Sequence, residues 1–152
     1  MFTVESAVRL PAPLPRVWRV ISEVDRFRFW HGLVVMKPHP TMPRKPYVHF
    51  RKHPTIGGDA DIVRFEPQTV FAWRLKLGPI FTWQEEYHLE RFEAGTQVTL
   101  RVQVRGLFSL LMKILPKARM RASLETSGIS LGRYLAQTLS QRPGQPSETR
   151  KR

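Results

Sequence analysis

Acidic side chains are the residues of this sequence whose placement could support chemistry, and Glu85 is the first of them. Residues 81–92 alternate with a period of two, which places Glu85 on the same face as Trp83 and Tyr87. That face carries the aromatic residues and should therefore point inward. A carboxylate in an apolar interior is costly unless it is paired or protonated. Glu85 is thus a candidate to bind the polar end of a ligand, or to act as a general acid or base.

Asp61 is the second catalytic candidate, and its role depends on the register of residues 59–66. One register turns Asp61, Val63 and Phe65 inward, and the rival register turns Ile62 and Arg64 inward. We expect the first register. Glu85 has no partner nearby in the sequence, which leaves a ligand, a water molecule or a distant arginine such as Arg64 as its partner.

Other common chemistries find little support in the sequence. The absence of cysteine excludes disulfides and thiol chemistry. No glycine-rich phosphate loop follows a strand, and the serines lack a base at suitable spacing. The histidines show no metal-ligand spacing, so we expect surface imidazoles, no metal and no cofactor. They are His31, His39, His49, His53 and His88.

The elements that position these carboxylates can be read from hydrophobic periodicity. Residues 2–10 alternate as a strand, and two short helices follow at 14–24 and 25–32, the second with Asp25 as its N-cap. Trp18 and Trp30 should pack these helices under the sheet. The later strands are expected at 33–37, 47–52, 59–66, 69–77, 81–92 and 96–105. Tight turns between the last four favour an antiparallel meander.

A long amphipathic helix is expected at 107–139. Pro116 should bend or divide it. Glu125 projects from its middle, where an ion pair with Arg121 one turn earlier is the structural alternative to ligand contact. Leu124, Leu131 and Leu135 lie to one side of the predicted apolar stripe. The stripe itself holds Leu107, Leu110, Leu111, Ile114, Ala118, Ala122, Ile129 and Ala136, with Ile114 and Ile129 at its centre.

Length and composition favour one domain at 1–140 and a disordered basic tail at 141–152. No apolar run is long enough for a membrane span, and the N-terminus lacks a signal peptide's pattern, so a cytoplasmic protein is expected. The formal charge of +13 raises the question of nucleic acid or anionic surfaces. The basic residues are dispersed, however, and many alternate with apolar residues on the expected strands.

Two stretches resemble a known family. VRLPAPLPRVWRVISEVDRFRFW combines a strand, a proline turn and a helix with a Val-Trp pair, and YHLERFEAGTQVTLRVQVRGLFSLLMK combines a hairpin with the start of the last helix. Over about residues 3–140 the chain resembles the START-like (SRPBCC) superfamily and its bacterial polyketide cyclase/dehydrase-type members. The resemblance implies an α+β helix-grip fold, in which a curved antiparallel sheet of about seven strands wraps around the C-terminal helix. The proline-rich segment 38–46 departs from the family's short turn.

These observations predict a protein that binds a hydrophobic or aromatic small molecule, lipid-like or polyketide-like, in a cavity between sheet and helix. The expected ligand-binding residues are Phe71, Trp73, Phe81, Trp83, Glu85, Tyr87, Ala118, Ala122, Glu125 and Ile129. The resemblance leaves open a cyclase or dehydratase that uses Glu85 or Asp61. A basic module that binds anionic surfaces or RNA is the other alternative.

Overall fold

The computed structural model describes residues 2–106 and 117–140 of the chain. Its strands are β1 (Phe2–Leu10), β2 (Val34–Lys37), β3 (Tyr47–Phe50), β4 (Gly57–Glu66), β5 (Val70–Leu77), β6 (Phe81–Phe92) and β7 (Gly95–Arg105). Its helices are α1 (Leu14–Ser22), the 3-10 turn η1 (Val24–Arg26), α2 (Phe27–Trp30) and α4 (Lys117–Ser140). The predicted α+β helix-grip architecture is thereby confirmed. The start of the predicted long helix and the predicted disordered tail lie outside the described residues.

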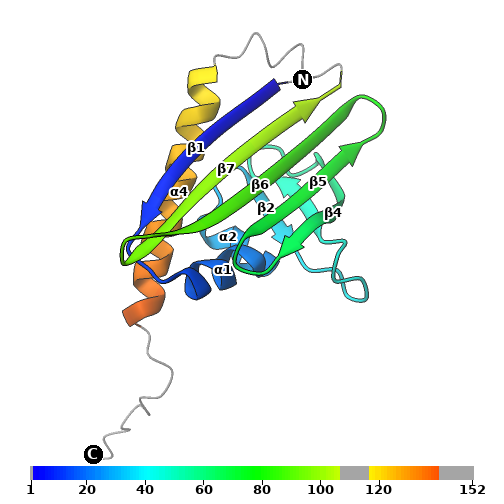
Figure 1. Ribbon diagram of the computed structural model, residues 1–152. Coiled ribbons are helices and arrows are strands. Elements are labelled where there is room, and N and C mark those ends of the chain that lie inside the picture. The colour runs from blue at the N-terminus through cyan, green and yellow to red at the C-terminus, as the bar shows by residue number, and fades with distance from the viewer. Residues whose placement is uncertain (1, 107–116, 141–152) are drawn as a thin grey trace, which may run out of the picture.

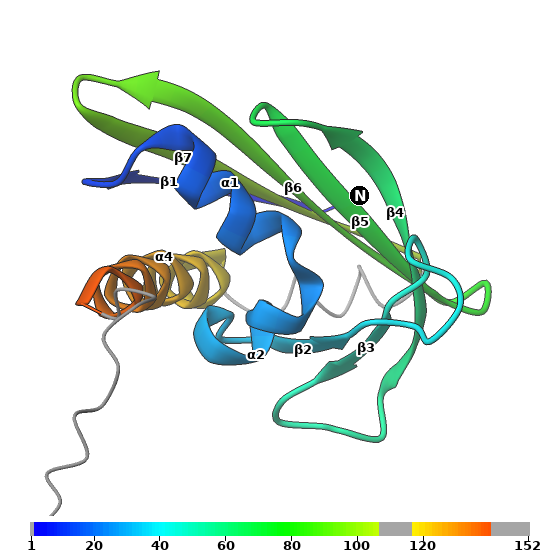
Figure 2. The ribbon, with the colours of Figure 1, turned by 90° about the horizontal axis from the view of Figure 1, so that it is seen from below.

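The sheet is antiparallel throughout, in the order β1-β7-β6-β5-β4-β3-β2. It curls, so that β2 and β3 turn toward the side that carries the helices (Figure 2). α1 and α2 lie on that concave side, while α4 runs along β1 at the other end of the strand order (Figure 1). The core therefore lies between the concave face of the sheet and these three helices.

The second short helix is less regular than its sequence suggests. The predicted helix at 25–32 is the turn η1 followed by the single helical turn α2. Asp25 lies inside η1, and no side-chain hydrogen bond caps either element, so the predicted N-cap is wrong. Trp18 and Trp30 are buried beneath the sheet as expected.

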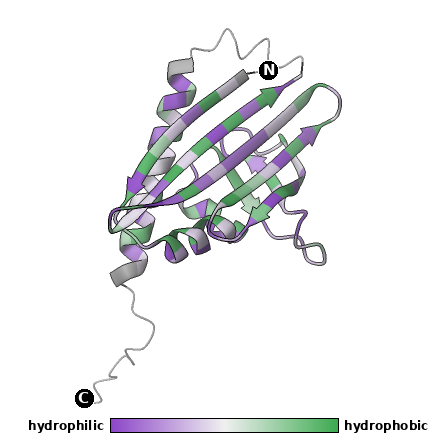
Figure 3. Cartoon of the chain, in the orientation of Figure 1, coloured by the Kyte–Doolittle hydropathy of each residue, from purple (hydrophilic) through white to green (hydrophobic). Residues whose placement is uncertain are grey.

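The inner faces of β5, β6 and β7 are those that the alternation predicts. Their buried inward residues are Phe71, Trp73 and Leu75 of β5, Trp83, Glu85, Tyr87 and Leu89 of β6, and Val98, Leu100, Val102 and Val104 of β7. Apolar and polar colours alternate along these strands in Figure 3. In β6 and β7 one face is buried and the other is more exposed, which is why a period of two is so clear in their sequence, whereas β5 also buries Val70 and Ala72 of its other face.

β4 follows neither of the two registers along its whole length. Ala60 is buried and Asp61 is exposed, so the first half of the strand has the register opposite to the expected one. The pairing with β5 then shifts between Ile62 and Arg64, which marks a β-bulge. After the bulge Phe65 packs edge-on against an aromatic ring of α1 and one of β5, as the expected register would place it.

α4 buries a different face from the predicted stripe. Its buried residues are Leu124, Ser127, Leu131 and Leu135, whereas Ile129 is 57% exposed. The prediction that Ile129 lies at the centre of the buried face is therefore wrong. The face that packs is rotated by roughly 150° about the helix axis, at about 100° per residue. The prediction carried one helical phase across Pro116, from residues 107–114 into α4.

Two glycines allow α4 to lie close to β1. A Cβ on Gly128 would lie 3.3 Å from the Cβ of Val8, and one on Gly132 would lie 3.4 Å from Leu10. Both distances are shorter than most contacts that Cβ atoms make in proteins. The missing side chains therefore set how closely α4 lies against β1.

Candidate functional site

Glu85 is fully buried and accepts hydrogen bonds from three side chains. The hydroxyl of Tyr87 donates to Oε2 over 2.7 Å, and the indole Nε1 of Trp83 donates to Oε1 over 3.1 Å. The third partner is His31, whose Nε2 lies 2.9 Å from Oε2 and 3.1 Å from Oε1. Alternation along β6 brings the first two partners, because residues two apart share a face. His31 comes from the end of α2, 54 positions earlier in the chain.

The protonation of His31 follows from what its other ring nitrogen does. Nδ1 accepts the backbone N–H groups of Leu33 and Val34 over 3.1 and 3.2 Å. A nitrogen that accepts from two N–H groups carries no proton, so the proton resides on Nε2. His31 is therefore neutral and donates to Glu85. The cluster holds one buried negative charge and three donors, and it is not an ion pair.

Arg51 holds the segment that carries His31. Its Nε donates to the carbonyl oxygen of His31 over 2.7 Å, and its Nη2 donates to the carbonyl oxygens of Phe27 and Arg28. The last carbonyls of a helix have no partner within the helix, and a guanidinium group satisfies several of them at once. Two sets of contacts therefore orient the imidazole. Arg51 binds the backbone carbonyl oxygen of His31, and the backbone N–H groups of residues 33–34 bind its Nδ1.

The cluster shifts two pKa values in opposite directions. Burial alone would raise the pKa of the Glu85 carboxyl, but the electrostatic attraction of His31, followed by the hydrogen bonds from His31, Tyr87 and Trp83, outweighs it and holds that pKa below its ordinary value. Burial raises the pKa of the Tyr87 phenol well above its ordinary value, and the adjacent Glu85 charge raises it further. Both groups therefore keep their charge states across the neutral range.

These contacts correct two predictions. A ligand, a water molecule or a distant arginine such as Arg64 was expected to bind Glu85, and His31 was expected at the surface, but His31 is 1% exposed and bonded to Glu85. A carboxylate with three donors and a lowered pKa is poorly suited to acid–base catalysis, since it neither holds a proton nor readily accepts one. The signal that could have identified His31 is the need of an inward carboxylate for a donor from another element.

The raised pKa of Tyr87 predicts a loss of stability in alkali. The unfolded chain ionises this phenol near its ordinary pKa of about 10, while the folded protein keeps it neutral. Its contribution is full below that value and is lost as the pH rises toward the folded pKa. Between about pH 9 and 11, urea midpoints of the native protein should fall more steeply than those of Tyr87→Phe, which cannot ionise there. Parallel slopes would contradict this expectation.

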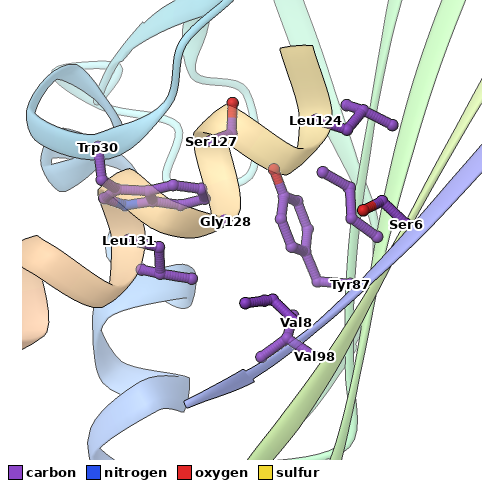
Figure 4. Close-up of a pocket in the computed structure, with 10 residues that line it drawn as sticks. Ser6, Val8, Trp30, Tyr87, Val98, Leu124, Ser127, Gly128 and Leu131 are labelled. Carbon is purple, nitrogen blue, oxygen red and sulfur yellow. The ribbon is translucent and has the colours of Figure 1, made fainter. Parts of the chain in front are cut away.

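A small cavity lies beside the cluster, between β1, β6, β7 and α4 (Figure 4). Its volume is about 20 Å³, close to the minimum that one water molecule needs. It is lined by Ser6, Val8, Trp30, Tyr87, Val98, Leu100, Leu124, Ser127, Gly128 and Leu131. The indole Nε1 of Trp30 is buried and has no hydrogen-bond partner among the described residues. An apolar cavity therefore adjoins a residue with a free buried donor.

The structure places most predicted pocket residues elsewhere. Tyr87 lines the cavity, but Phe71, Trp73 and Trp83 are packed in the core. Phe81 is half-buried at the start of β6. The side chains fill the space that alternation alone assigns to the inner face. A sequence period of two predicts which side chains point inward. It does not predict whether space remains between them.

The other predicted residues do not face the cavity. On α4, Ala122 and Glu125 are exposed like Ile129, because the buried face of the helix is the other one. The described ion pairs do not include the expected one between Glu125 and Arg121. Asp61 is exposed, 3.4 Å from the Nζ of Lys45, because its half of β4 has the opposite register. The side chain of Ala118 lies outside the described residues.

Neither a metal centre nor a membrane span is found in the part of the chain that the structure describes. No group of three or more histidine, aspartate or glutamate side chains there could hold a metal ion. None of the helices at 2–106 and 117–140 is long and apolar enough to cross a bilayer.

Comparison with known families identifies one match. Residues 1–126 match the family described as polyketide cyclase/dehydrase and lipid transport. No curated protein matches the chain significantly in sequence.

Several solved structures share the fold. The Nitrosomonas europaea protein NE0264 is 12% identical with a TM-score of 0.68, over 91% of this chain and 96% of that one. The Thermus thermophilus protein TTHA0849 is 14% identical with a TM-score of 0.68, over 90% and 99%. DynU16, from the dynemicin biosynthetic locus, is 22% identical with a TM-score of 0.65 over 90% of this chain. The chain spans only 48% of DynU16. Identities this low establish the fold alone.

Proposed function

Since the chain belongs to the polyketide cyclase/dehydrase and lipid transport family, we propose that it binds a hydrophobic small molecule bearing an oxygen acceptor, between the sheet and α4. The observation that carries the proposal is an apolar cavity lined by Trp30, whose buried indole N–H has no hydrogen-bond partner among the described residues. The ligand's apolar body would lie along α4 and β1, and its oxygen would accept the hydrogen bond of Trp30.

A buried donor without an acceptor destabilises a protein by about 1–3 kcal/mol. Phenylalanine would fill similar space without that penalty, so the indole at Trp30 is better explained by an acceptor that it meets in use. In the unliganded protein one water molecule could serve, since the cavity has the volume for it. A ligand oxygen would displace that water and supply the same bond.

The cavity must widen to admit a drug-sized or lipid-sized molecule, because such ligands need several hundred Å³. The wall most suited to move is α4. Its contacts with β1 run through Gly128 and Gly132, which meet Val8 and Leu10 by van der Waals contact. It is tied to the end of α2 by one hydrogen bond, from the backbone N–H of Gly32 to the Ser127 hydroxyl over 3.1 Å. An outward shift of α4 that enlarges the cavity would break this hydrogen bond and disturb those of Arg16 with Leu135 and Thr138, so ligand binding must offset their loss.

Binding is favoured over catalysis by the placement of the two candidate carboxylates. Glu85 is occupied by three donors, and Asp61 is exposed on the outer side of β4. A cyclase or dehydratase needs a group that can exchange a proton with the substrate. Neither carboxylate lines the cavity, which leaves the enzymatic alternative without its proposed base.

A matched pair of ligands tests the role of Trp30. Acetonaphthone carries a carbonyl acceptor, while ethylnaphthalene has nearly the same shape without it. Calorimetric titration of the native protein should show about fivefold tighter binding of the ketone, as one hydrogen bond predicts. Trp30→Phe should abolish that preference, because it removes the donor and keeps an aromatic ring.

Trp73→Phe is the matched control, since Trp73 is the other buried indole without a partner among the described residues and it does not line the cavity. The preference for the ketone should survive in that variant. Failure of both ligands to bind, or equal loss of the preference in both variants, would refute the proposal. Native mass spectrometry of the purified protein should in addition reveal a co-purified apolar molecule.

A further inference from the structure

A second concave surface lies between α1 and the last turns of α4. It is an open groove of about 550 Å³ lined by Pro13, Pro15, Arg16, Arg19, Val20, Arg26 and Thr138. We call it the arginine groove. Arg16 and Arg19 are three positions apart on α1 and therefore lie on neighbouring turns of one side. No acidic residue is among the described residues that line it.

The three guanidinium groups differ in how they are held. Arg16 is anchored, because its Nη2 donates over 2.9 Å both to the carbonyl oxygen of Leu135 and to the Thr138 hydroxyl. Arg26 pairs with Glu23 through Nε, and its Nη1 lies 3.5 Å from the Tyr134 hydroxyl. Arg19 makes no side-chain hydrogen bond or ion pair with any described residue.

This arrangement leaves positive charge and free donors directed at the groove. A guanidinium group has five N–H donors, and Arg16 uses one nitrogen while Arg19 uses none. Only Arg26 has a carboxylate partner, so the groove carries a net positive charge. Arg16 and Arg26 are oriented by α4, and a ligand would therefore lose less side-chain entropy by binding them than by binding free surface arginines.

We propose that the arginine groove binds a phosphate group. Guanidinium groups match the oxygens of phosphate in pairs, and several of them around one site favour a doubly charged group over a single carboxylate. The volume accommodates a phosphate with the first part of the molecule that carries it. This proposal does not depend on the apolar ligand proposed for the cavity.

The neighbouring surface bears on what the phosphate is attached to. Tyr134, which contacts Arg26, stacks on Phe29 with ring centroids 5.6 Å apart. Phe29 is 56% exposed, and the guanidinium of Arg28 lies 4.6 Å from its ring centroid. A basic groove beside an exposed aromatic ring suits both a soluble phosphate ester with an apolar part and the headgroup of an anionic lipid. The two sources share the phosphate, and the experiment must separate them.

The test uses two phosphate probes at constant ionic strength. One is inorganic phosphate, titrated by calorimetry, and the other is phosphatidylcholine vesicles containing phosphatidic acid, followed by cosedimentation. Arg19→Gln removes a donor that touches no described side chain, so the fold should be unaffected. It should weaken binding by about tenfold, as the loss of one charge-assisted hydrogen bond predicts. Arg26→Gln should do the same.

Arg91→Gln is the matched control, because Arg91 is an exposed arginine of β6 that lacks a side-chain partner among the described residues. It removes the same charge and should leave binding within about twofold, the change expected for a surface substitution outside the site. Arginine-dependent binding of inorganic phosphate supports a soluble ester, and arginine-dependent binding of vesicles alone supports a lipid headgroup. Absence of binding to both probes, or equal weakening by Arg91→Gln and Arg19→Gln, would overturn the proposal.

Discussion

Replacement of Glu85 with leucine is expected to lower the free energy of unfolding by about 3–5 kcal/mol. The substitution removes the only acceptor that the structure shows for three buried donors, on His31, Trp83 and Tyr87. Each donor would then be buried without a partner, which is more costly than the loss of one hydrogen bond. Urea unfolding followed by circular dichroism measures the change.

Two further variants make this result specific. Glu85→Gln keeps one acceptor oxygen but directs an amide N–H₂ at a donor, so its effect should be smaller than that of leucine and still clear. Glu90→Leu, on the exposed end of the same strand, should change stability by about 0.5 kcal/mol or less. A neutral or stabilising effect of Glu85→Leu would show that the carboxylate is unpaired, as the sequence alone suggests, and would return it to the ligand site.

Truncation of Leu131 to alanine is expected to lower the free energy of unfolding by about 2–5 kcal/mol, because it leaves a cavity under a fully packed helix. Leu131 is 2% exposed on the face of α4 that meets the sheet and α2. Ile129→Ala, two positions away, should change the free energy of unfolding by about 0.5 kcal/mol or less, since the Ile129 side chain is 57% exposed. The same urea experiment applies to both variants.

This pair is a direct test of which face of α4 is buried. The two side chains have nearly the same volume and lie within one turn, so helix propensity affects them similarly. Equal losses of stability would mean that the helix packs with the face predicted from periodicity. A larger loss for Ile129→Ala would reverse the assignment made from the structure.

Local periodicity predicted the parts of this fold whose structure depends on residues that are close together in the sequence. Tight turns hold β5, β6 and β7 in hairpins, so a period of two was enough to assign Trp73, Trp83, Glu85 and Tyr87 to the inner face. The order of elements and the family resemblance together predicted the helix-grip architecture.

The predictions that were wrong concern features that depend on contacts between distant parts of the chain. The partner of Glu85 is His31 from α2, and no local pattern connects a strand residue with a helix end 54 positions away. A single bulge in β4 turned Asp61 outward, since one extra residue reverses every side chain before it relative to those after it. The face of α4 that packs is fixed by its contacts with β1 and α2, which are distant in the sequence.

The sequence by itself therefore determined that the last four strands pair as a meander and which side chains of β5, β6 and β7 point inward, because hairpin geometry and alternation act over a few residues. Only the tertiary structure decided what those side chains do. It showed that the inward side chains pack closely, that a cavity of about 20 Å³ lies beside Trp30, and that three arginines line one groove between α1 and α4. Packing density and long-range polar pairing depend on how all elements fit together at once, and no local pattern encodes that fit.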